Sequence, residues 1–571
     1  QDAPRSFNKT PAMIKFFTEK IGYQYPFDKY AQTIVSDFTF GGMENTSATT
    51  LTEDTIHTAD VHEDTPSDGL VAHELAHQWW GDLVTCRSWS HLWLNEGFAT
   101  FFASLWKEQD QGRDEYLMEM IGHFHSYTDE EENLYRRPIV YNRYHEPDTL
   151  FDSTTYRKGA LVLNMLRWQL GEKRFWKAMN HYARKFEYKN ADTNDFKVAI
   201  EEVTGEDLEW FFDQWVYKAG YPEFVVDYHW DETAKLVRLQ VKQTQTVDDL
   251  TPIFRTPVDV EIVTERGRQL HRIQVLGQEQ EYHLPADLRP LMVRFDKTGV
   301  LIKKLKFNRP KDQILYQLQN DTEAWGRIEA ARELKAYTSD ETVIAALTRA
   351  ASQDSFWGVR AEAANTLGSS NLPSALESLI AVYRDTNLKV RRSVIEALGN
   401  SRDERAFELL KRALETDSSI SVVAAAAATL GKTGTPRAFE LLTLALTRNS
   451  HQEIVRIGVF DGLKNLKDSR AVPLALQWAE NGAPRRARTA AIRTLSALGK
   501  GREDVAAFLI GLLSDPVYSV RRASVEALKE VGETSALDPL NRRLNVEPDG
   551  RIRFAIREAL QRLNEQKRAR L

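Results

Sequence analysis

Three patterns of hydrophobic and polar positions follow one another along the chain. Residues 1 to about 221 mix short alternating runs with longer stretches of helical period. Residues 222 to about 308 change to short segments that alternate apolar and polar positions, with turn residues between them: EFVVDYHW, KLVRLQVKQTQ, TPVDVEIVT, HRIQVLG and LMVRFD. A period of two predicts half-buried strands. The middle part is therefore predicted to be a small antiparallel β-sandwich.

The last part, residues 309–571, repeats with a period near 32. A three-residue motif recurs, a small residue, any residue and then an arginine. Each copy is followed by an Ala-rich helix that ends in Leu-Gly or a similar pair. The arginines are separated by 33, 31, 65, 32, 33 and 32 residues, and Val423 takes the place of the one missing from the double gap: Arg327, Arg360, Arg391, Arg456, Arg488, Arg521 and Arg553. Two helices per unit at this period predict an α-solenoid of about eight repeats, resembling HEAT repeats. We expect the arginines to bind neighbouring carbonyls or carboxylates in a ladder rather than a ligand.

Length and composition narrow the choice of protein class. A chain of 571 residues is too long for one core, so we expect several domains, 1–221, 222–308 and 309–571, in a multidomain α+β protein. The net charge of -7 does not suggest a nucleic-acid partner. The sequence has no run of about eighteen apolar residues, so it does not predict a membrane span. The single cysteine, Cys86, excludes an intramolecular disulfide and a cysteine-rich metal site, and is expected to be a small buried residue.

Residues 73–80, HELAHQWW, carry the first candidate chemistry. His73 and His77 are four residues apart, which places them on one face of a helix where both imidazoles can point at the same ion. Zinc accepts imidazole nitrogen and carboxylate oxygen, and a catalytic zinc takes three protein ligands and keeps one position for water. Two histidines therefore need a third ligand.

Glu96 is the predicted third ligand. It follows His77 after eighteen residues, in the segment WLNEGFAT. Its neighbours Trp93, Leu94 and Phe98 predict a buried segment, and a buried carboxylate needs a partner. We expect one zinc ion per chain. Glu74 is not needed as a ligand, so it can take a proton from a zinc-bound water and pass it to the leaving amine.

GGMEN, residues 41–45, follows the alternating segment AQTIVSDFTF. The two glycines can close a hairpin as a simple turn. Alternatively, bare backbone lets a peptide approach the edge of a strand closely, and Glu44 can then receive a cation such as a free α-amine.

These motifs together resemble the gluzincin aminopeptidases of peptidase family M1, of the alanyl and puromycin-sensitive type. The resemblance rests on GGMEN, HELAHQWWGDLVT and WLNEGFATFFA, and FDKYAQTIVSDF and STTYRKGALVLNML match in order and spacing. It covers about residues 10–221 closely, and implies a thermolysin-like fold there. A β-domain and a helical C-terminal part are in the places usual for the family.

The resemblance implies a role for ten residues of this sequence. They are the zinc ligands His73, His77 and Glu96, the general base Glu74, Glu44 for the substrate ammonium, the strand edge Gly41, Gly42 and Met43, Tyr156 for the oxyanion, and Phe40 beside the first side chain of the substrate. A phenol beside zinc makes physical sense in that role, because it stabilises charge that develops only in the transition state.

One feature of the family is missing from this sequence, the N-terminal β-domain. We therefore expect a fragment whose missing domain is absent or supplied by another chain; the alternative is a naturally short homologue with an open cleft. Whether these residues are active without that domain is left open. The leading hypothesis is a zinc aminopeptidase acting on peptides with a free N-terminus. The alternatives are a thermolysin-like endopeptidase, against which GGMEN speaks, and an inactive fragment or HEAT-repeat binding scaffold. Compartment (cytoplasmic, periplasmic or secreted) and oligomeric state are left open.

Overall fold

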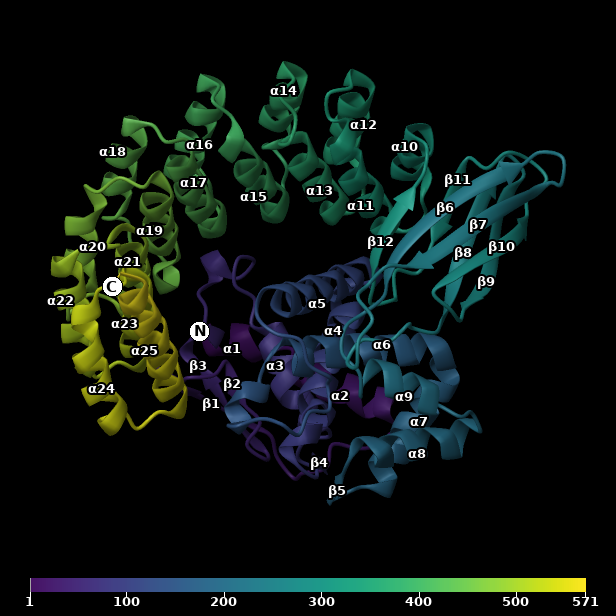
Figure 1. Cartoon of the computed structure of the whole chain (residues 1–571), viewed down its shortest axis with the longest axis horizontal. Helices are drawn as coiled ribbons and strands as arrows, with labels where there is room; N and C mark the ends of the chain where they lie inside the picture. The colour runs from purple at the N-terminus through teal and green to yellow at the C-terminus, as the bar shows by residue number, and fades with distance from the viewer. Residues whose placement is uncertain (1, 571) are drawn as a thin grey trace.

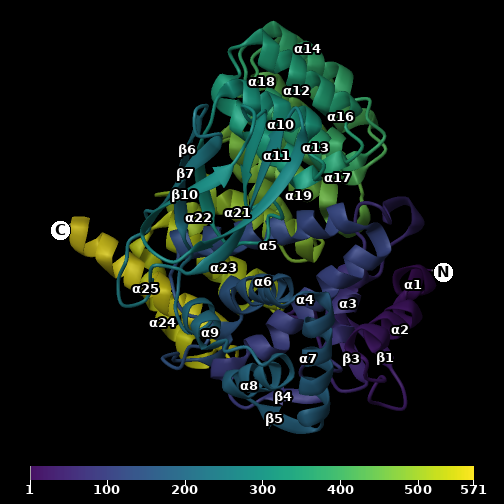
Figure 2. The ribbon, with the colours of Figure 1, turned by 90° about the vertical axis from the view of Figure 1, so that its right-hand side faces the viewer.

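The computed structural model describes residues 2–570 and shows three parts in succession. In Figure 1 the purple and blue N-terminal part lies below, the β part lies to its right, and the helices that follow arch over the N-terminal part to the yellow C-terminal helices. The view turned by 90° shows the same helical stack above and behind the N-terminal part (Figure 2). Among residues 2–570, no helix has both the length and the apolar character that a bilayer crossing requires.

The N-terminal part is mostly helical. Its helices are α1 (Asp2–Phe7), α2 (Thr10–Ile21), α3 (Asp68–Ala76), α4 (Trp93–Gln111), α5 (Arg113–Asn133), α6 (Gly159–Leu170), α7 (Glu172–Lys185), α8 (Thr193–Thr204) and α9 (Glu209–Trp215), with a π-helical turn η5 (Thr154–Lys158) before α6. Its strands are β1 (Ala31–Val35), β2 (Gly42–Met43), β3 (Ala48–Thr52), β4 (Val84–Cys86) and β5 (Lys189–Ala191).

Helix α4 is the centre of this part. Its residues from Trp93 to Trp106 are all buried, the polar Asn95, Glu96, Thr100 and Ser104 among them. It packs against α3, α5, α6 and η5. A β-carbon added to Gly97 would lie 3.0 Å from the Cα of Gly159, so paired glycines let η5 and α6 approach α4 closely. This approach holds the residues of η5 beside those of α3 and α4.

A small sheet in the order β1-β3-β2 covers one side of α3. β1 runs parallel to β3, and β2 pairs antiparallel to β3 through Gly42 with Leu51 and Met43 with Thr50. The hairpin of β2 and β3 is closed by residues 46–47, where Ser47 has a φ of 60°. The interpretation of the two glycines as the hairpin turn is therefore wrong, because Gly42 lies in the edge strand itself.

The β part is a pair of sheets. Its strands are β6 (Glu223–Asp231), β7 (Leu236–Gln243), β8 (Thr256–Thr264), β9 (Gly267–Val275), β10 (Glu279–Pro285), β11 (Met292–Phe295) and β12 (Lys304–Asn308). They form one sheet in the order β10-β7-β6-β12 and another in the order β11-β8-β9. The sheets pack face to face, with Phe224 of β6 and Phe295 of β11 at 5.3 Å between ring centres. All pairings are antiparallel within this described part except β12 with β6, which is parallel.

The C-terminal part consists of helix pairs, as the repeat period predicts. The helices are α10 (Lys311–Asn320), α11 (Ala324–Glu333), α12 (Glu341–Gln353), α13 (Trp357–Leu367), α14 (Pro373–Val382), α15 (Leu388–Ala397), α16 (Glu404–Thr416), α17 (Ile420–Lys432), α18 (Pro436–Ala445), α19 (Ile454–Leu466), α20 (Ala471–Ala479), α21 (Arg485–Leu498), α22 (Glu503–Gly511), α23 (Tyr518–Val531), α24 (Leu537–Val546) and α25 (Gly550–Arg570). The odd-numbered helices pack one against the next, and their apolar faces form one continuous core. This is the α-solenoid expected from the sequence.

The recurring arginines bind as predicted. Arg327, Arg360 and Arg391 each pair with an aspartate 25–27 residues ahead, at 2.7 Å, 2.7 Å and 3.0 Å, and Arg488 and Arg521 make the same contact with Asp515 and Glu547. Several also donate to a main-chain carbonyl at the start of their own repeat. These five arginines thus tie their repeats to the next, whereas Arg456 and Arg553 bind groups that precede them in the chain; both arrangements are structural.

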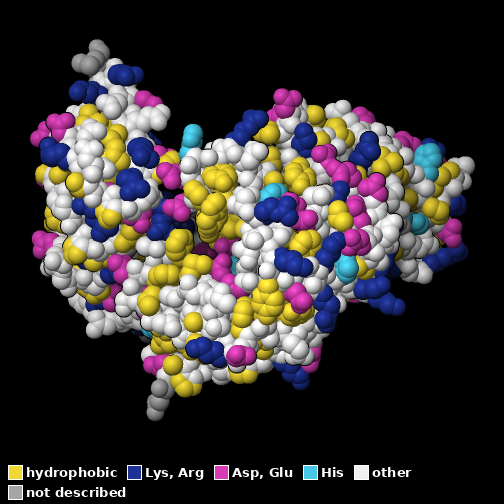
Figure 3. Space-filling model, turned by 90° about the horizontal axis from the view of Figure 1, so that it is seen from below, with side chains coloured by type: hydrophobic (Ala, Val, Ile, Leu, Met, Phe, Trp, Pro, Cys, Tyr) yellow, Lys and Arg dark blue, Asp and Glu magenta, His cyan; other side chains and the backbone are white. Residues whose placement is uncertain are grey.

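The solenoid contacts the N-terminal part again from the start of α17 to α25. Arg485 of α21 pairs with Glu53, and Ser419 at the start of α17 donates to Asp64 Oδ1 at 2.5 Å. Arg551 of α25 lies over the ring of Phe40 at 4.5 Å. On the face seen in Figure 3, hydrophobic side chains gather around a recess near the middle, in which acidic side chains are visible.

Candidate active site

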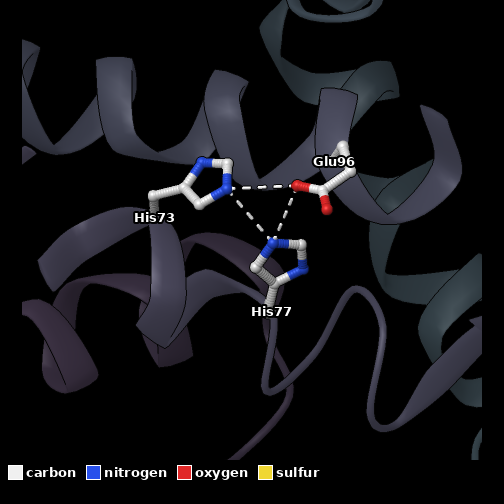
Figure 4. Close-up of side chains that lie close together, drawn as sticks. All are labelled: His73, His77 and Glu96. Atoms are coloured by element: carbon white, nitrogen blue, oxygen red, sulfur yellow. Dashed lines mark hydrogen bonds and ion pairs between the residues drawn. The ribbon is translucent and has the colours of Figure 1, made fainter. Parts of the chain in front are cut away.

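Three side chains from α3 and α4 converge on one point (Figure 4). His73 lies on α3, His77 is the residue that ends it, and Glu96 lies on the first turns of α4. The Nε2 atoms of the two histidines are 3.2 Å apart, and each is 3.2 Å from Glu96 Oε2. The three ligands predicted from the sequence are thus brought together.

This triangle matches the spacing that zinc requires. Bonds of about 2.0–2.1 Å at tetrahedral angles separate ligand atoms by about 3.3–3.4 Å. Two imidazoles and one carboxylate are also the donor set that zinc accepts. His77 Nδ1 lies 3.0 Å from the carbonyl oxygen of Trp80, to which it donates, so Nε2 is the nitrogen that faces the triangle and would bind a metal once it gives up its proton. The residues therefore fit a zinc ion.

The two histidines beside Glu96 keep its carboxyl group ionised. Burial raises the pKa of this carboxyl, but the charge of His77 and hydrogen bonds from both histidines outweigh burial and bring it well below its usual value. An ionised carboxylate is the form that binds a metal. Thr100 donates to the main-chain carbonyl of Glu96 at 2.7 Å, one turn further along α4.

Glu74 lies beside the triangle and against β2. Burial raises the pKa of Glu74 to about 8, with His77 opposing and Glu44 and Glu96 adding to the shift. Its carboxylate occupies the space where a β-carbon of Gly42 would stand. Sequence reasoning assigned this glycine to the approach of a peptide, and missed that the neighbouring carboxylate needs the same space.

Glu44 is the second carboxylate near His77. Its Oε1 is 3.9 Å from His77 Nδ1. A second cluster next to the triangle consists of two carboxylates and this histidine: Glu44, Glu74 and His77. Gln78 holds the loop that carries Glu44, because it accepts from the Ser47 amide at 2.8 Å and donates to the Glu44 carbonyl at 3.2 Å. Sequence reasoning missed Gln78, although its place directly after the second histidine was visible.

Tyr156 approaches the triangle from the π-helical turn η5. Its ring is nearly parallel to that of His73, 5.9 Å away between centres. Burial, followed by the negative charge of Glu96, raises the pKa of the phenol, which keeps it protonated and able to donate. Phe151 lies 6.4 Å from Tyr156 and 6.1 Å from both Phe40 and Trp89, between ring centres. Phe40 stands at this aromatic wall and is 40% exposed.

All ten residues predicted from the sequence line a single cavity of about 980 Å³. Its wall follows α4 from Leu92 through Glu96 and Thr100 to Ala103. The wall also includes side chains that sequence reasoning did not select: Leu70, Trp89, Phe151, Glu119, His123 and Arg157. Cys86 lies in this wall half-buried, and burial raises the pKa of its thiol to about 11, so it is a poor nucleophile at neutral pH.

Comparison with known proteins places two family models on the chain. Residues 5–215 match the peptidase family M1 domain, and residues 312–387, 376–459 and 476–561 match HEAT repeats. Among curated proteins, the chain is 36% identical over 217 residues to "Aminopeptidase M1-D" of Oryza sativa subsp. japonica, which is 37% of this chain and 25% of the relative. It is 34% identical over 231 residues to "Glutamyl aminopeptidase" of Sus scrofa, 38% of this chain and 24% of the relative.

An archaeal relative and a solved structure extend the comparison. "Probable aminopeptidase 2" of Sulfurisphaera tokodaii is 29% identical over 296 residues, which are 50% of this chain and 37% of the relative. The chain thus spans about a quarter to somewhat over a third of the length of these curated relatives. The crystal structure of Legionella pneumophila aminopeptidase A in complex with aspartic acid matches with a TM-score of 0.73 at 17% identity, covering 97% of this chain and 73% of the other, which shows a shared fold.

Proposed function

Since residues 5–215 form a peptidase family M1 domain followed by HEAT repeats, we propose that the chain is a zinc aminopeptidase that removes N-terminal residues from peptides. The observation that carries the proposal is the triangle of His73, His77 and Glu96, whose ligand atoms are 3.2 Å apart. The proposal draws further support from the ten predicted residues lining one cavity, which favours an enzyme over a scaffold with a vestigial site.

His73, His77 and Glu96 would hold the zinc ion. Bound there, zinc supplies a Lewis acid and lowers the pKa of a coordinated water. The remaining chemistry falls to side chains of this chain. Glu74 accepts a proton from the attacking water on its carboxylate and delivers it to the nitrogen of the leaving amine. Its contact with Gly42 fixes the carboxylate for both transfers.

Tyr156 acts on the oxygen of the scissile carbonyl. Its phenol donates a hydrogen bond to that oxygen as negative charge develops there. The raised pKa of the phenol supports this role, since a protonated donor is required. The stacked ring of His73 keeps the phenol close to the reacting group.

Glu44 and β2 position the substrate. Glu44 accepts the free α-ammonium, which sets the scissile bond one residue from the N-terminus. β2 is the edge strand of its sheet, so one side of Gly42 and Met43 is open to pair with an extended peptide. Phe40, Trp89 and Phe151 form the aromatic wall next to this strand, against which the first side chain rests.

The proposal is tested by metal content and a paired substrate panel. We expect one zinc per purified chain and cleavage of aminoacyl-coumarin amides with a free amine but not of their N-acetylated counterparts. Equal cleavage of both sets would contradict the role of Glu44 and the exopeptidase mode. A chain that binds no zinc would contradict the proposal as a whole.

A further inference from the structure

The cavity has two chemically different ends. The end next to β2 is aromatic, with Phe40, Trp89 and Phe151. The other end lies further along α4 and α5 and is polar, with Glu119, His123 and Arg157. The proposed mechanism uses the aromatic end and the middle, and leaves the polar end without a function.

A chain of hydrogen bonds organises the polar end. Arg157 Nη1 donates to Nδ1 of His123 at 3.4 Å, and His123 Nε2 lies 3.1 Å from Ser104 Oγ, which donates to Glu119 Oε1 at 3.2 Å. Burial lowers the pKa of His123 to about 4, so its imidazole is neutral and accepts from the arginine. Glu119 is already neutralised by Lys107, whose Nζ is 2.7 Å from its second oxygen.

Arg157 is left with a neutral partner. Within residues 2–570, no carboxylate lies within 4.0 Å of its guanidinium. A half-buried cation in a cavity wall costs free energy unless an anion completes it. The guanidinium presents a rigid fork of donors that matches a carboxylate in two hydrogen bonds. The site is therefore built to receive an anion that the described residues do not supply.

A second cavity continues from this end. It measures about 380 Å³ and shares Glu119, His123 and Arg157 with the first. Its far wall belongs to the solenoid, where Lys389 lies over the ring of Trp357 at 4.2 Å. A peptide that extends past Arg157 thus enters a second cavity rather than meeting a closed wall, and the cation there, Lys389, already pairs with Glu115 at 3.5 Å.

The geometry also says which part of a peptide reaches Arg157. Glu44 lies beside His77, whereas Tyr156 and the following Arg157 lie on the side of His73. A peptide whose amine is bound by Glu44 crosses the metal-binding triangle toward Arg157 with the residues that follow the scissile bond. Along α4, the polar end at Ser104 is two turns from Glu96, about 12 Å, which an extended peptide spans in about three to four residues.

We infer that Arg157 is a specificity-determining residue that binds a carboxylate within the first three residues after the scissile bond; this inference rests on the proposed aminopeptidase function. Two sources offer that group: the terminal carboxylate of a short peptide and the side chain of an aspartate or glutamate. Both would form the same paired hydrogen bonds with the guanidinium. His123 and Ser104 are positioning residues that hold Arg157 in the wall.

The test compares peptides that differ only in one carboxylate. We would measure affinities calorimetrically on the Glu74→Gln variant, so that peptides are bound without turnover, for alanine tri- and tetrapeptides as free acids and as C-terminal amides. Amidated peptides with glutamate or glutamine at each of the three positions after the first residue form the second set. We expect about tenfold tighter binding of the carboxylate member in at least one set.

Variants then assign the preference to Arg157. In the same background, Arg157→Met should bring the ratio of affinities to about one, and Arg157→Lys should keep part of it, since lysine retains the charge without the fork. Arg349→Met is the matched control, because Arg349 is exposed on the distant α12 and its loss removes an equal charge. Thermal melting of each variant checks that it is folded.

The outcomes separate this inference from the proposed function. A preference for acids over amides identifies the terminal carboxylate, and a preference for glutamate over glutamine identifies the side chain. Equal affinities in both sets, no binding of any peptide, or a preference that survives in Arg157→Met overturns the inference. If the wild-type chain nevertheless cleaves aminoacyl-coumarin amides, the aminopeptidase proposal stands without it. If it cleaves nothing, the affinity ratios still decide the role of Arg157.

Discussion

The carboxylate of Glu74 lies against the bare Cα of Gly42, so the proposed base and the edge strand for the peptide occupy adjoining space. An added β-carbon at Gly42 would overlap the carboxylate oxygen, its carbon and the methylene behind it. The position of this glutamate therefore depends on the absence of a side chain thirty-two residues earlier. The same contact leads to the first prediction.

Gly42→Ala should lower kcat by about a hundredfold or more, because the displaced Glu74 can no longer transfer protons at the correct distance. Zinc content should stay at the wild-type level, since the ligands are not touched. The control is Gly69→Ala at the start of α3, where an added β-carbon meets nothing within 4 Å. Steady-state kinetics with metal analysis measure both, and a Gly42→Ala variant with normal kcat would remove the contact from the mechanism.

Glu74→Gln should retain zinc and lose about a thousandfold or more in kcat, because the amide is nearly the same size but cannot accept a proton. Substrate affinity should change little, since Glu44 and β2 remain. Pre-steady-state binding and turnover assays separate the two quantities. Retained turnover would exclude Glu74 as the base.

Removing zinc should lower the thermal stability of the N-terminal part. A metal that binds only the folded chain contributes about 4 kcal/mol at a thousandfold excess over its Kd. Without it, two histidines and a carboxylate are held 3.2 Å apart with no ion between them. Calorimetry with a chelator, followed by zinc addition, should show a fall and recovery of Tm. The recovery should be absent in Glu96→Ala. A Tm that does not change on addition of the chelator would contradict the proposed zinc site.

Asp515→Ala should destabilise the solenoid by about 3–5 kcal/mol, because it leaves the guanidinium of Arg488 buried without its anion. The side chains of this pair are 2% and 5% exposed. The exposed pair of Arg502 and Asp504 in the same region is the control, and Asp504→Ala should cost less than about 1 kcal/mol. Chemical denaturation followed by circular dichroism measures the two differences. Equal effects would mean that burial of the arginine pairs does not matter.

Lys158 should make the free energy of unfolding rise with pH in the alkaline range. Burial lowers the pKa of this ammonium to about 8, with Glu131 opposing the shift. Between about pH 8 and 10.5 the unfolded chain then binds more protons than the folded one, so stability rises with pH, by up to about 1.4 kcal/mol per pH unit. Below pH 8 the cost of burying the charge is fully present. Relative to Lys158→Met, the wild type should thus gain stability from pH 7.5 to 9.5, and a constant difference would be contrary to this.

The sequence predicted the parts of this protein that depend on local spacing. Strand alternation, a period near 32 and the four-residue step from His73 to His77 are local properties, so the β part, the solenoid and two of the proposed ligands could be predicted directly. Glu96 could be added because its apolar neighbours predict burial. The boundaries 221/222 and 308/309 stay a prediction, as do the roles of the ten site residues.

Contacts between distant segments were not predictable in this way. The tie between Gln78 and the Glu44 loop, and the unpaired charge of Arg157 beside His123, depend on how helices approach one another. Strand β12 was not among the predicted strands, and its parallel pairing with β6 was missed with it, since alternation does not give the direction of a strand. Predictions from sequence therefore reach the proposed metal ligands and, through the family resemblance, one side of the cavity, but not its polar end at Glu119, His123 and Arg157.

The return of the solenoid to the N-terminal part fixes how many repeats the chain can have. Within the solenoid each repeat packs on its neighbours, so the position of the last helix depends on every repeat before it. One helix pair more or fewer would shift α25 by about 10 Å, the spacing of packed helices. Arg551 would then miss Phe40, and Arg485 would miss Glu53. The number of repeats is thus tied to a contact between residues more than 400 positions apart.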